Sequence, residues 1–221
     1  MRPNIPQFLL SLIFLSAVTS CHRDNSPTPA SHYTTDTLTT SFPNSGFTPY
    51  ELMFLSNPAT NSGDSTTPDL LAEAYNLGAY TTYGNSYFRF NLTPIPAGTT
   101  LRSATLYLFS DTLPQYGDGV HANTGLSDDL VIQRVAGSWD QHTLYSNQPP
   151  LDTAGKIHVP ATTQHFLNLQ IDVTTIVNNM TAEGNYGFEM HLLIGQPGTS
   201  RIFCSSRYFD ARRHPFLVVT Y

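Results

Sequence analysis

The chain has 221 residues, 16 acidic against 10 basic side chains, and a formal net charge of −6 at pH 7. Charged residues make up only 12% of it, which argues against the basic surface of a nucleic-acid-binding protein and against a helical cytosolic enzyme. The abundance of Ser, Thr, Asn, Gly, Pro and Tyr is typical of a turn-rich β protein outside the cell.

The first 21 residues predict export. Arg2 supplies a positive start, residues 8–18 form a short apolar run, and Val18-Thr19-Ser20-Cys21 has the form of a lipobox. A membrane span needs about 20 apolar residues, so this run suits a cleaved signal at residues 1–20 better. We expect Cys21 to carry a lipid that anchors the mature chain. The alternative is an ordinary secretory signal in which Cys21 is incidental.

The position after the lipobox suggests a location. His22 is not the Asp that retains lipoproteins at the inner membrane of well-studied bacteria, so an outer membrane or cell surface is favoured. Residues 21–44 are predicted to be a flexible tether and lead-in, because this polar, Pro-containing stretch cannot bury a core. Residues 45–221 are predicted to form one domain.

Short alternating segments predict strands. In residues 86–92, Phe88, Phe90 and Leu92 fall on one face, and the prolines that follow cannot donate to a ladder. Further strands are expected at 101–110, 130–136, 186–194, 201–206 and 216–221, with a loop at 111–129. Roughly eight to ten strands separated by turns predict an all-β antiparallel sandwich.

One short helix interrupts this pattern. Val173, Ile176, Val177 and Met180 recur at helical spacing, Asp172 or Thr174 can cap the N-terminus, and Gly184 ends the run.

Only two cysteines occur, and a lipid on Cys21 would leave Cys204 unpaired. Cys204 alternates with Ile202 along a predicted strand, which favours a buried free thiol over a reactive nucleophile.

Four segments together resemble one family. They include a strand followed by Ile-Pro-Ala-Gly and Ala-x-Leu-x-Leu, then Ser-Trp-Asp, and a terminal Leu-Val-Val-Thr-Tyr; they are residues 88–108, 134–149, 171–188 and 203–221. Their order and spacing resemble the DNRLRE domain, also described as carbohydrate-binding module family 96, over about residues 45–221. The resemblance implies a jelly-roll β-sandwich on secreted proteins, with members that bind acidic polysaccharides such as alginate. The chain departs from the family after Ser138-Trp139, where Tyr145 takes the place of a second Trp, and His214 replaces the usual Arg before the last strand.

Sugar recognition needs flat apolar rings for C–H faces and fixed polar groups for hydroxyls. The aromatic candidates are Tyr87, Tyr107, Trp139 and Tyr145. If the ligand contains uronates, the candidate carboxylate clamps are Arg89, Arg102 and Arg134. Two alternatives stay open: Trp139 can be a core residue, and Arg89 can brace Asp172 or a loop carbonyl.

A metal or a catalytic site has weaker support. Residues 116–129 are rich in oxygen donors, so a structural calcium ion on Asp118, Asn123, Asp128 and Asp129 is weighed against an ordinary solvated loop, which is favoured. No other cofactor is expected. The histidines lack zinc spacing, no pair of carboxylates stands in a glycosidase frame, and no Gly-x-Ser-x-Gly elbow occurs.

The sequence therefore predicts a noncatalytic, lipid-anchored module that binds polysaccharide, acidic glycans included, and acts as a monomer without nucleic acid. The alternative is a structural or adhesive lipoprotein that holds protein or matrix. A polysaccharide lyase using a Tyr or His base is a third, less favoured interpretation.

Overall fold

A computed structural model describes residues 33–40, 51–140, 144 and 147–221. Residues 33–221 belong to one unit of the chain. The signal segment, Cys21 and Tyr145 lie outside the described residues.

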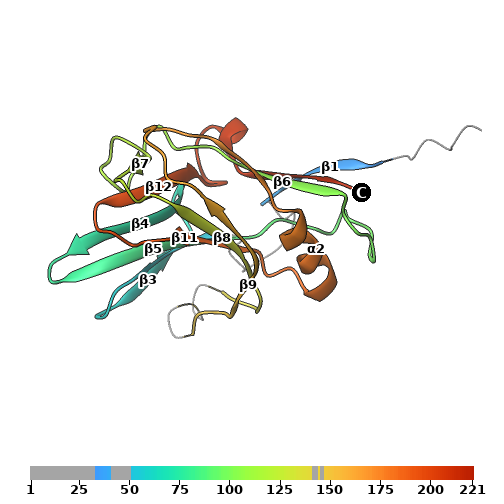
Figure 1. Cartoon of the computed structure of the whole chain (residues 1–221), viewed down its shortest axis with the longest axis horizontal. Coiled ribbons are helices and arrows are strands. Elements are labelled where there is room, and N and C mark those ends of the chain that lie inside the picture. The colour runs from blue at the N-terminus through green and yellow to red at the C-terminus, as the bar shows by residue number, and fades with distance from the viewer. Residues whose placement is uncertain (1–32, 41–50, 141–143, 145–146) are drawn as a thin grey trace, which may run out of the picture. The chain divides into compact units, whose positions relative to one another are not determined.

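Two antiparallel sheets build this unit (Figure 1). In the four-stranded sheet the strand order is β1 (Thr35–Thr39), β13 (Phe216–Thr220), β6 (Ser103–Leu108) and β10 (Leu169–Asp172). β1 falls within the segment expected to lead into the domain, and it pairs with the last strand of the chain.

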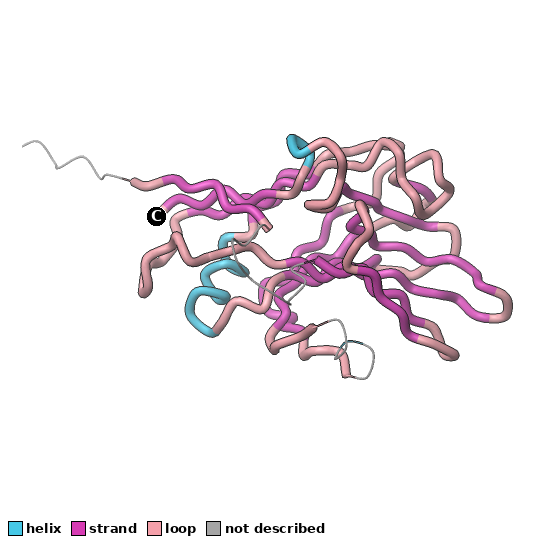
Figure 2. Tube along the Cα trace, turned by 180° about the vertical axis from the view of Figure 1, so that it is seen from behind, coloured by secondary structure: helices cyan, strands magenta, loops and turns pink. Residues whose placement is uncertain are grey.

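The second sheet has nine strands. Its main path is β7 (Asn123–Thr124), β12 (Thr199–Cys204), β4 (Asp69–Leu77), β5 (Tyr80–Phe88), β11 (Phe188–Leu192), β8 (Leu130–Val135) and β9 (Leu151–Val159). β2 (Glu51–Ser56) pairs with β5 and with β3 (Asn61–Asp64). All strand pairs in the described part are antiparallel. Strands make up most of the regular structure (Figure 2), and the predicted all-β sandwich is confirmed.

The main core lies between the two sheets. Ala104, Leu106 and Leu108 of β6 are completely buried, as the alternating pattern predicted. On the larger sheet Phe88 and Phe188 stack with their ring centroids 5.4 Å apart. Phe90 is also buried here, although β5 already ends at Phe88. Burial of this apolar area is the principal stabilising contribution to such a fold.

The predicted helix is present as α2 (Thr174–Glu183), with Ile176, Val177 and Met180 buried. Asp172 Oδ1 accepts the backbone N–H of Thr174 at 2.9 Å just before the helix, and Gly184 ends it with a φ of 121°. A side chain at that φ would be strained, which explains the glycine. Within the described residues, no helix has the length and apolar character needed to cross a membrane.

The sequence did not predict β4, because the burial of its residues does not alternate: the strand begins with six buried residues. Every residue of β12 is likewise buried, although a strand at 201–206 was predicted there. Both strands are covered on their second face by Met53, Ala122 and Tyr116, which pack with Leu71 and Ile202. A strand that is buried on both faces loses the polar–apolar alternation by which a strand is recognised.

Cys204 is completely buried at the end of β12. Burial raises the pKa of its thiol to about 12. Such a thiol stays protonated at neutral pH, and only the thiolate is nucleophilic. The surroundings of Cys204 therefore agree with the predicted buried, unreactive thiol.

Candidate carbohydrate-binding groove

A groove of about 480 Å³ lies on the larger sheet, and we call it the β5 groove. Polar side chains from several strands line it, together with one aromatic ring. The lining residues are Ser56, Glu73, Tyr83, Asn85, Gln133, Gln148, Leu151, Glu189, His191, Leu192 and Gly195.

Strand register explains why the polar residues meet. Glu189 of β11 lies opposite Tyr87 of β5 on one side and opposite Gln133 of β8 on the other. Side chains two residues apart share a face, so Asn85 lies on the same face of β5 as Tyr87, and His191 lies on the same face of β11 as Glu189. The intervening residues, such as Phe88 and Phe188, point into the core. One face of three neighbouring strands therefore carries the hydrogen-bonding groups.

Glu189 is the centre of the hydrogen bonds in the groove. Its side chain is about 1% exposed, and Oε2 accepts Gln133 Nε2 at 3.0 Å and lies 2.8 Å from His191 Nδ1. These contacts fix the rotamers of all three side chains. A polar site held in this way is organised before a ligand arrives, which lowers the entropic cost of binding.

Tyr83 is the aromatic side chain of the groove, and 43% of the residue is exposed. A Cβ atom added to Gly195 would lie 2.2 Å from Tyr83 Cε1, so the ring is packed directly against the glycine backbone. The missing side chain at position 195 thus allows the ring to take this place. An exposed, supported ring is suited to stacking on the apolar face of a sugar.

Glu73 of β4 adds a second acidic residue to the lining. Gly117 donates its backbone N–H to Glu73 Oε2 at 3.2 Å, whereas Oε1 is buried without a hydrogen-bond partner. Burial raises the pKa of Glu73 to about 7. Its neighbour across the strands is Gly84, where a Cβ atom would lie 2.7 Å from Glu73 Cγ. The glycine leaves room for the glutamate chain.

The predicted aromatic residues that the structure describes, Tyr87, Tyr107 and Trp139, do not line this groove. Tyr87 and Trp139 are buried in one small cluster, with ring centroids 5.5 Å apart. Trp139 Nε1 donates to the carbonyl of Tyr186 at 2.7 Å, so the hydrogen-bonding group of the indole is satisfied within the protein. Tyr107 lies on the other sheet, stacked on Phe216 at 4.5 Å.

The three predicted arginines lie apart from one another. Arg134 is buried and binds Asp152, Glu183 and the carbonyl of Asn179. Arg89 is half-buried beside Gly187. Arg102 is exposed, with its Cζ atom 4.4 Å from the centroid of the Tyr33 ring. The structure therefore does not bring them together into one carboxylate clamp.

Each of the residues weighed for calcium already makes a hydrogen bond within the protein. Asp118 caps its own turn, Asn123 Nδ2 donates to the Gln164 carbonyl, and Asp129 lies 2.7 Å from His158 Nε2. Asp128 accepts the Thr162 amide at 2.8 Å. In the part of the chain that is described, no group of three or more His, Cys, Asp or Glu is placed to hold a metal. Calcium binding by this chain stays a prediction.

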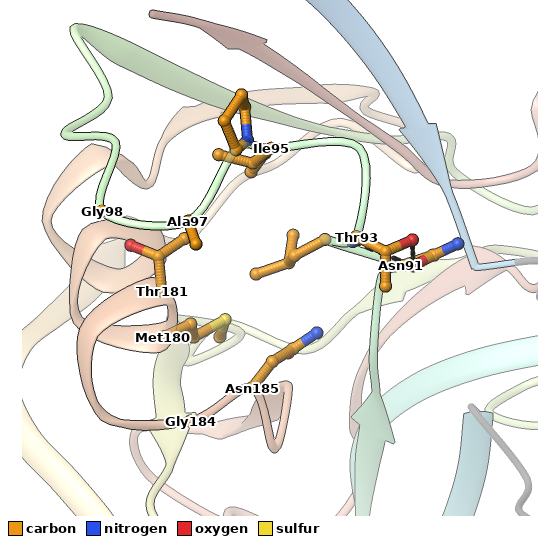
Figure 3. Close-up of a pocket in the computed structure, with 11 residues that line it drawn as sticks. Asn91, Thr93, Ile95, Ala97, Gly98, Met180, Thr181, Gly184 and Asn185 are labelled. Carbon is orange, nitrogen blue, oxygen red and sulfur yellow. Dashed lines mark hydrogen bonds between the residues drawn. The ribbon is translucent and has the colours of Figure 1, made fainter.

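A second pocket, of about 350 Å³, lies between residues 91–98 and the C-terminal end of α2. Ile95, Ala97 and Met180 surround it (Figure 3). Its walls are largely apolar, and Asn185 uses its Nδ2 to donate to the Phe90 carbonyl. This pocket offers few groups that could orient sugar hydroxyls, so the β5 groove is the better candidate for a glycan.

The groove residues Tyr83, Asn85, Gln133, Glu189 and His191 were not among the sequence-based candidates. A partial signal existed, because Glu189 and His191 alternate with apolar residues along a predicted strand. Their meeting with Gln133 and Tyr83 depends on strand pairing between distant segments, which spacing along the chain does not give.

A β-sandwich that presents a preorganised polar groove and a supported tyrosine on one sheet has the architecture of a sugar-binding module. The sequence model of carbohydrate-binding module family 96 matches residues 54–221, and the chain belongs to this family. The resemblance seen in the sequence is thereby confirmed. The comparison with curated proteins finds no significant match.

Proposed function

We propose that this protein is a noncatalytic module that binds polysaccharide in the β5 groove. Membership of the carbohydrate-binding family supports the ligand class. The observation that carries the choice of site is the set of Gln133, Glu189 and His191, fixed by mutual hydrogen bonds beside the exposed ring of Tyr83. Hydroxyl groups of a sugar would bind the polar set, while a sugar ring would stack on the tyrosine.

Replacing Tyr83 by alanine is expected to weaken glycan binding about tenfold, because stacking on an aromatic ring contributes on the order of 1 kcal/mol or more. Tyr83 is 43% exposed and does not belong to the buried core, so the free energy of unfolding should change much less than the affinity. Isothermal titration of the full-length protein in detergent against a panel of oligosaccharides measures the effect. Tyr80→Ala is the matched control, because Tyr80 is 46% exposed and is not part of the groove lining. Equal losses for the two variants would contradict the proposed site.

Substituting Gly195 by valine should also weaken binding, by displacing the Tyr83 ring. The added Cβ would collide with Tyr83 Cε1, and the two γ-methyl groups of the valine would keep the ring from its native position. Gly198→Val is not a suitable control, since Gly198 has a φ of 84° and would be strained. Gln196→Val is preferred, because Gln196 is exposed in the same loop. Unchanged affinity in the Gly195 variant would show that the position of the ring is irrelevant.

Anchoring and location are part of the same proposal. A lipid on Cys21 would hold the module to a membrane, and the outer membrane or cell surface is the favoured site. Labelled fatty acid should enter the wild-type chain and not the Cys21→Ala variant.

Avidity between many anchored monomers would compensate for weak binding by each one. A single species of monomer mass on size exclusion tests the oligomeric state.

A uronate-containing ligand stays a prediction. It rests on Arg102, the exposed member of the predicted arginines, together with the Tyr33 ring beneath it. Oligouronate binding that is lost in Arg102→Gln would support it.

Incubation with alginate or pectin should yield no unsaturated ends if the module is noncatalytic. Failure to bind any glycan would favour the structural or adhesive alternative.

A further inference from the structure

We infer that the protein carries a second glycan-binding surface, on the outer face of the smaller sheet, and that this surface takes acidic sugars. Arg207 and Arg212 would bind the carboxylates, while the rings of Tyr107, Phe209 and Phe216 would lie against the sugars. The inference rests on the proposed function for the ligand class, and it adds a site that is separate from the β5 groove.

The outer face of the smaller sheet is open in the part of the chain that the structure describes. Alternate residues of its strands point into the core between the sheets, so the residues between them point outward. None of these outward residues is buried. They are Thr35, Thr37, Thr39, Ser103, Thr105, Tyr107, Gln170, Asp172, Phe216, Val218 and Thr220.

One row of this face combines rings with polar groups. Phe216 of β13 lies opposite Tyr107 of β6, and the two rings stack with their centroids 4.5 Å apart. The register continues the row to Thr39 of β1 on one side and to Gln170 of β10 on the other, and both residues are exposed. The row therefore presents an apolar centre between a hydroxyl and an amide, which are the kinds of group that sugar recognition needs.

Residues 206–214 lie between β12 and β13, and we call them the arginine loop. Phe209 is 78% exposed here, and its ring centroid lies 4.4 Å from that of the buried Tyr208 ring. Tyr208 is held by His214 Nε2, which donates to its carbonyl at 2.7 Å, and its Oη lies 3.4 Å from Thr112 Oγ1. Figure 1 shows the short coil of this loop, in red, at the end of the smaller sheet where β13 begins. The exposed ring is thus supported beside the open face.

The charge of the arginine loop favours an anionic ligand. The loop has three arginines and one carboxylate, in a chain whose net charge is −6. Arg213 donates to neutral oxygens, and no described residue accepts from the exposed Arg207 guanidinium. Arg212 gives Nε and Nη2 to Asp210 at 3.0 and 2.9 Å, but its side chain is 89% exposed and has further N–H groups to donate. A guanidinium group can bind a carboxylate through two parallel hydrogen bonds.

A second exposed arginine borders the same face at its other end. The backbone N–H of Arg102 donates to the Thr220 carbonyl at 2.8 Å, where β13 ends, and its Cζ atom lies over the Tyr33 ring. Both ends of the open face therefore place a guanidinium group near an aromatic ring. The lining of the β5 groove, by contrast, contains no lysine or arginine. A linear polyuronate, which repeats a carboxylate along its length, matches this arrangement on the smaller sheet.

The test is isothermal titration of the full-length protein in detergent at pH 7.5, with an oligouronate tetrasaccharide and a neutral glucan or mannan tetrasaccharide. Arg207→Gln should weaken oligouronate binding about tenfold, because a charge-assisted pair is lost. Phe209→Ala should weaken it by a similar factor, through the loss of the stacking ring. Both variants should bind the neutral ligand within about twofold of wild type, since that ligand binds in the β5 groove.

Lys156→Gln and Phe166→Ala are the matched controls. Lys156 is an exposed cation on β9, and Phe166 is a ring that is 41% exposed; both lie outside the groove lining, the arginine loop and the smaller sheet. They should leave both affinities unchanged.

Three results would overturn the inference. Wild type could bind the neutral ligand and not the oligouronate, the arginine-loop variants could behave like their controls, or they could weaken both ligands equally. In each of these cases the proposed function of the β5 groove stands. If neither tetrasaccharide binds and a wider glycan panel also fails, the proposed function is wrong, and the inference fails with it.

Discussion

Replacement of Arg201 by methionine is expected to lower the free energy of unfolding by about 3–5 kcal/mol. Arg201 and Asp128 are both fully buried, with Nη1 3.6 Å from Oδ2, and Nη1 also donates to the carbonyls of Asp128 and Pro160 at 3.3 Å. Burial raises the pKa of Asp128, while the Arg201 charge opposes that rise. Without the guanidinium, the buried Asp128 side chain loses its counter-charge and two carbonyls lose a donor.

Chemical denaturation measures this loss, and a second substitution tests its cause. Asp128→Asn removes the charge but keeps an oxygen that can accept the Thr162 amide, so the double variant should recover part of the stability lost in Arg201→Met. Arg212→Met is the control for an exposed pair, because the Arg212 side chain is 89% exposed where it binds Asp210. Its cost should be much smaller than that of Arg201→Met, because solvent screens the exposed pair. A loss in Arg201→Met no larger than in this control would contradict the assignment.

The second large effect is a loss of stability as the pH rises from about 5 to 8. Asp69 and Asp111 are completely buried, and their side chains lie within hydrogen-bonding distance of each other. Gln115 donates its backbone N–H to Asp69 and Leu113 donates its backbone N–H to Asp111. The other oxygen of each carboxyl, Asp69 Oδ1 and Asp111 Oδ2, receives no donor from another residue. Two facing carboxylates cannot both ionise in such a place, so the pair retains a proton.

The sign follows from the pKa values. Burial and the neighbouring Asp111 raise the pKa of Asp69 from 3.8 to about 8. The folded state then binds more protons than the unfolded state between these two values. The stabilisation is complete below about pH 4 and is lost as the pH rises through 8, by up to about 1.4 kcal/mol per pH unit. Glu73, with a pKa of about 7, contributes in the same direction.

Asp69→Asn should remove much of this pH dependence. The amide nitrogen can replace the shared proton as a donor to Asp111, and the amide oxygen can still accept the Gln115 N–H. Thermal unfolding between pH 5 and pH 9 would show a flatter profile for this variant, with its largest gain over wild type at the alkaline end. Asp118→Asn is the control, in the loop that also carries Asp111, because hydrogen bonds lower the pKa of Asp118 and its contribution is complete before this range begins. Identical profiles for wild type and Asp69→Asn would disprove a shared proton.

The local pattern of the sequence was sufficient for the sandwich. The alternation of Ala104, Leu106 and Leu108 identifies a strand with one buried face, and the spacing from Val173 to Met180 identifies α2, which Gly184 ends. These features depend on neighbours along the chain, so they can be derived from periodicity. The family resemblance rests on the same strand segments, and it holds over residues 54–221.

The functional surface was decided by tertiary structure. Tyr87 and Trp139 are aromatic, but both are buried in one cluster with Leu52, Phe54, Val135 and Leu144. Arg134 is paired with acidic residues from β9 and α2. Conversely, Tyr83, Gln133 and Glu189 come together in one groove only because β11 pairs with β5 on one side and with β8 on the other. The alternating pattern of a strand predicts which of its side chains point away from the protein core. Which of them face solvent together, and which are covered, is fixed by contacts between segments that are distant along the chain.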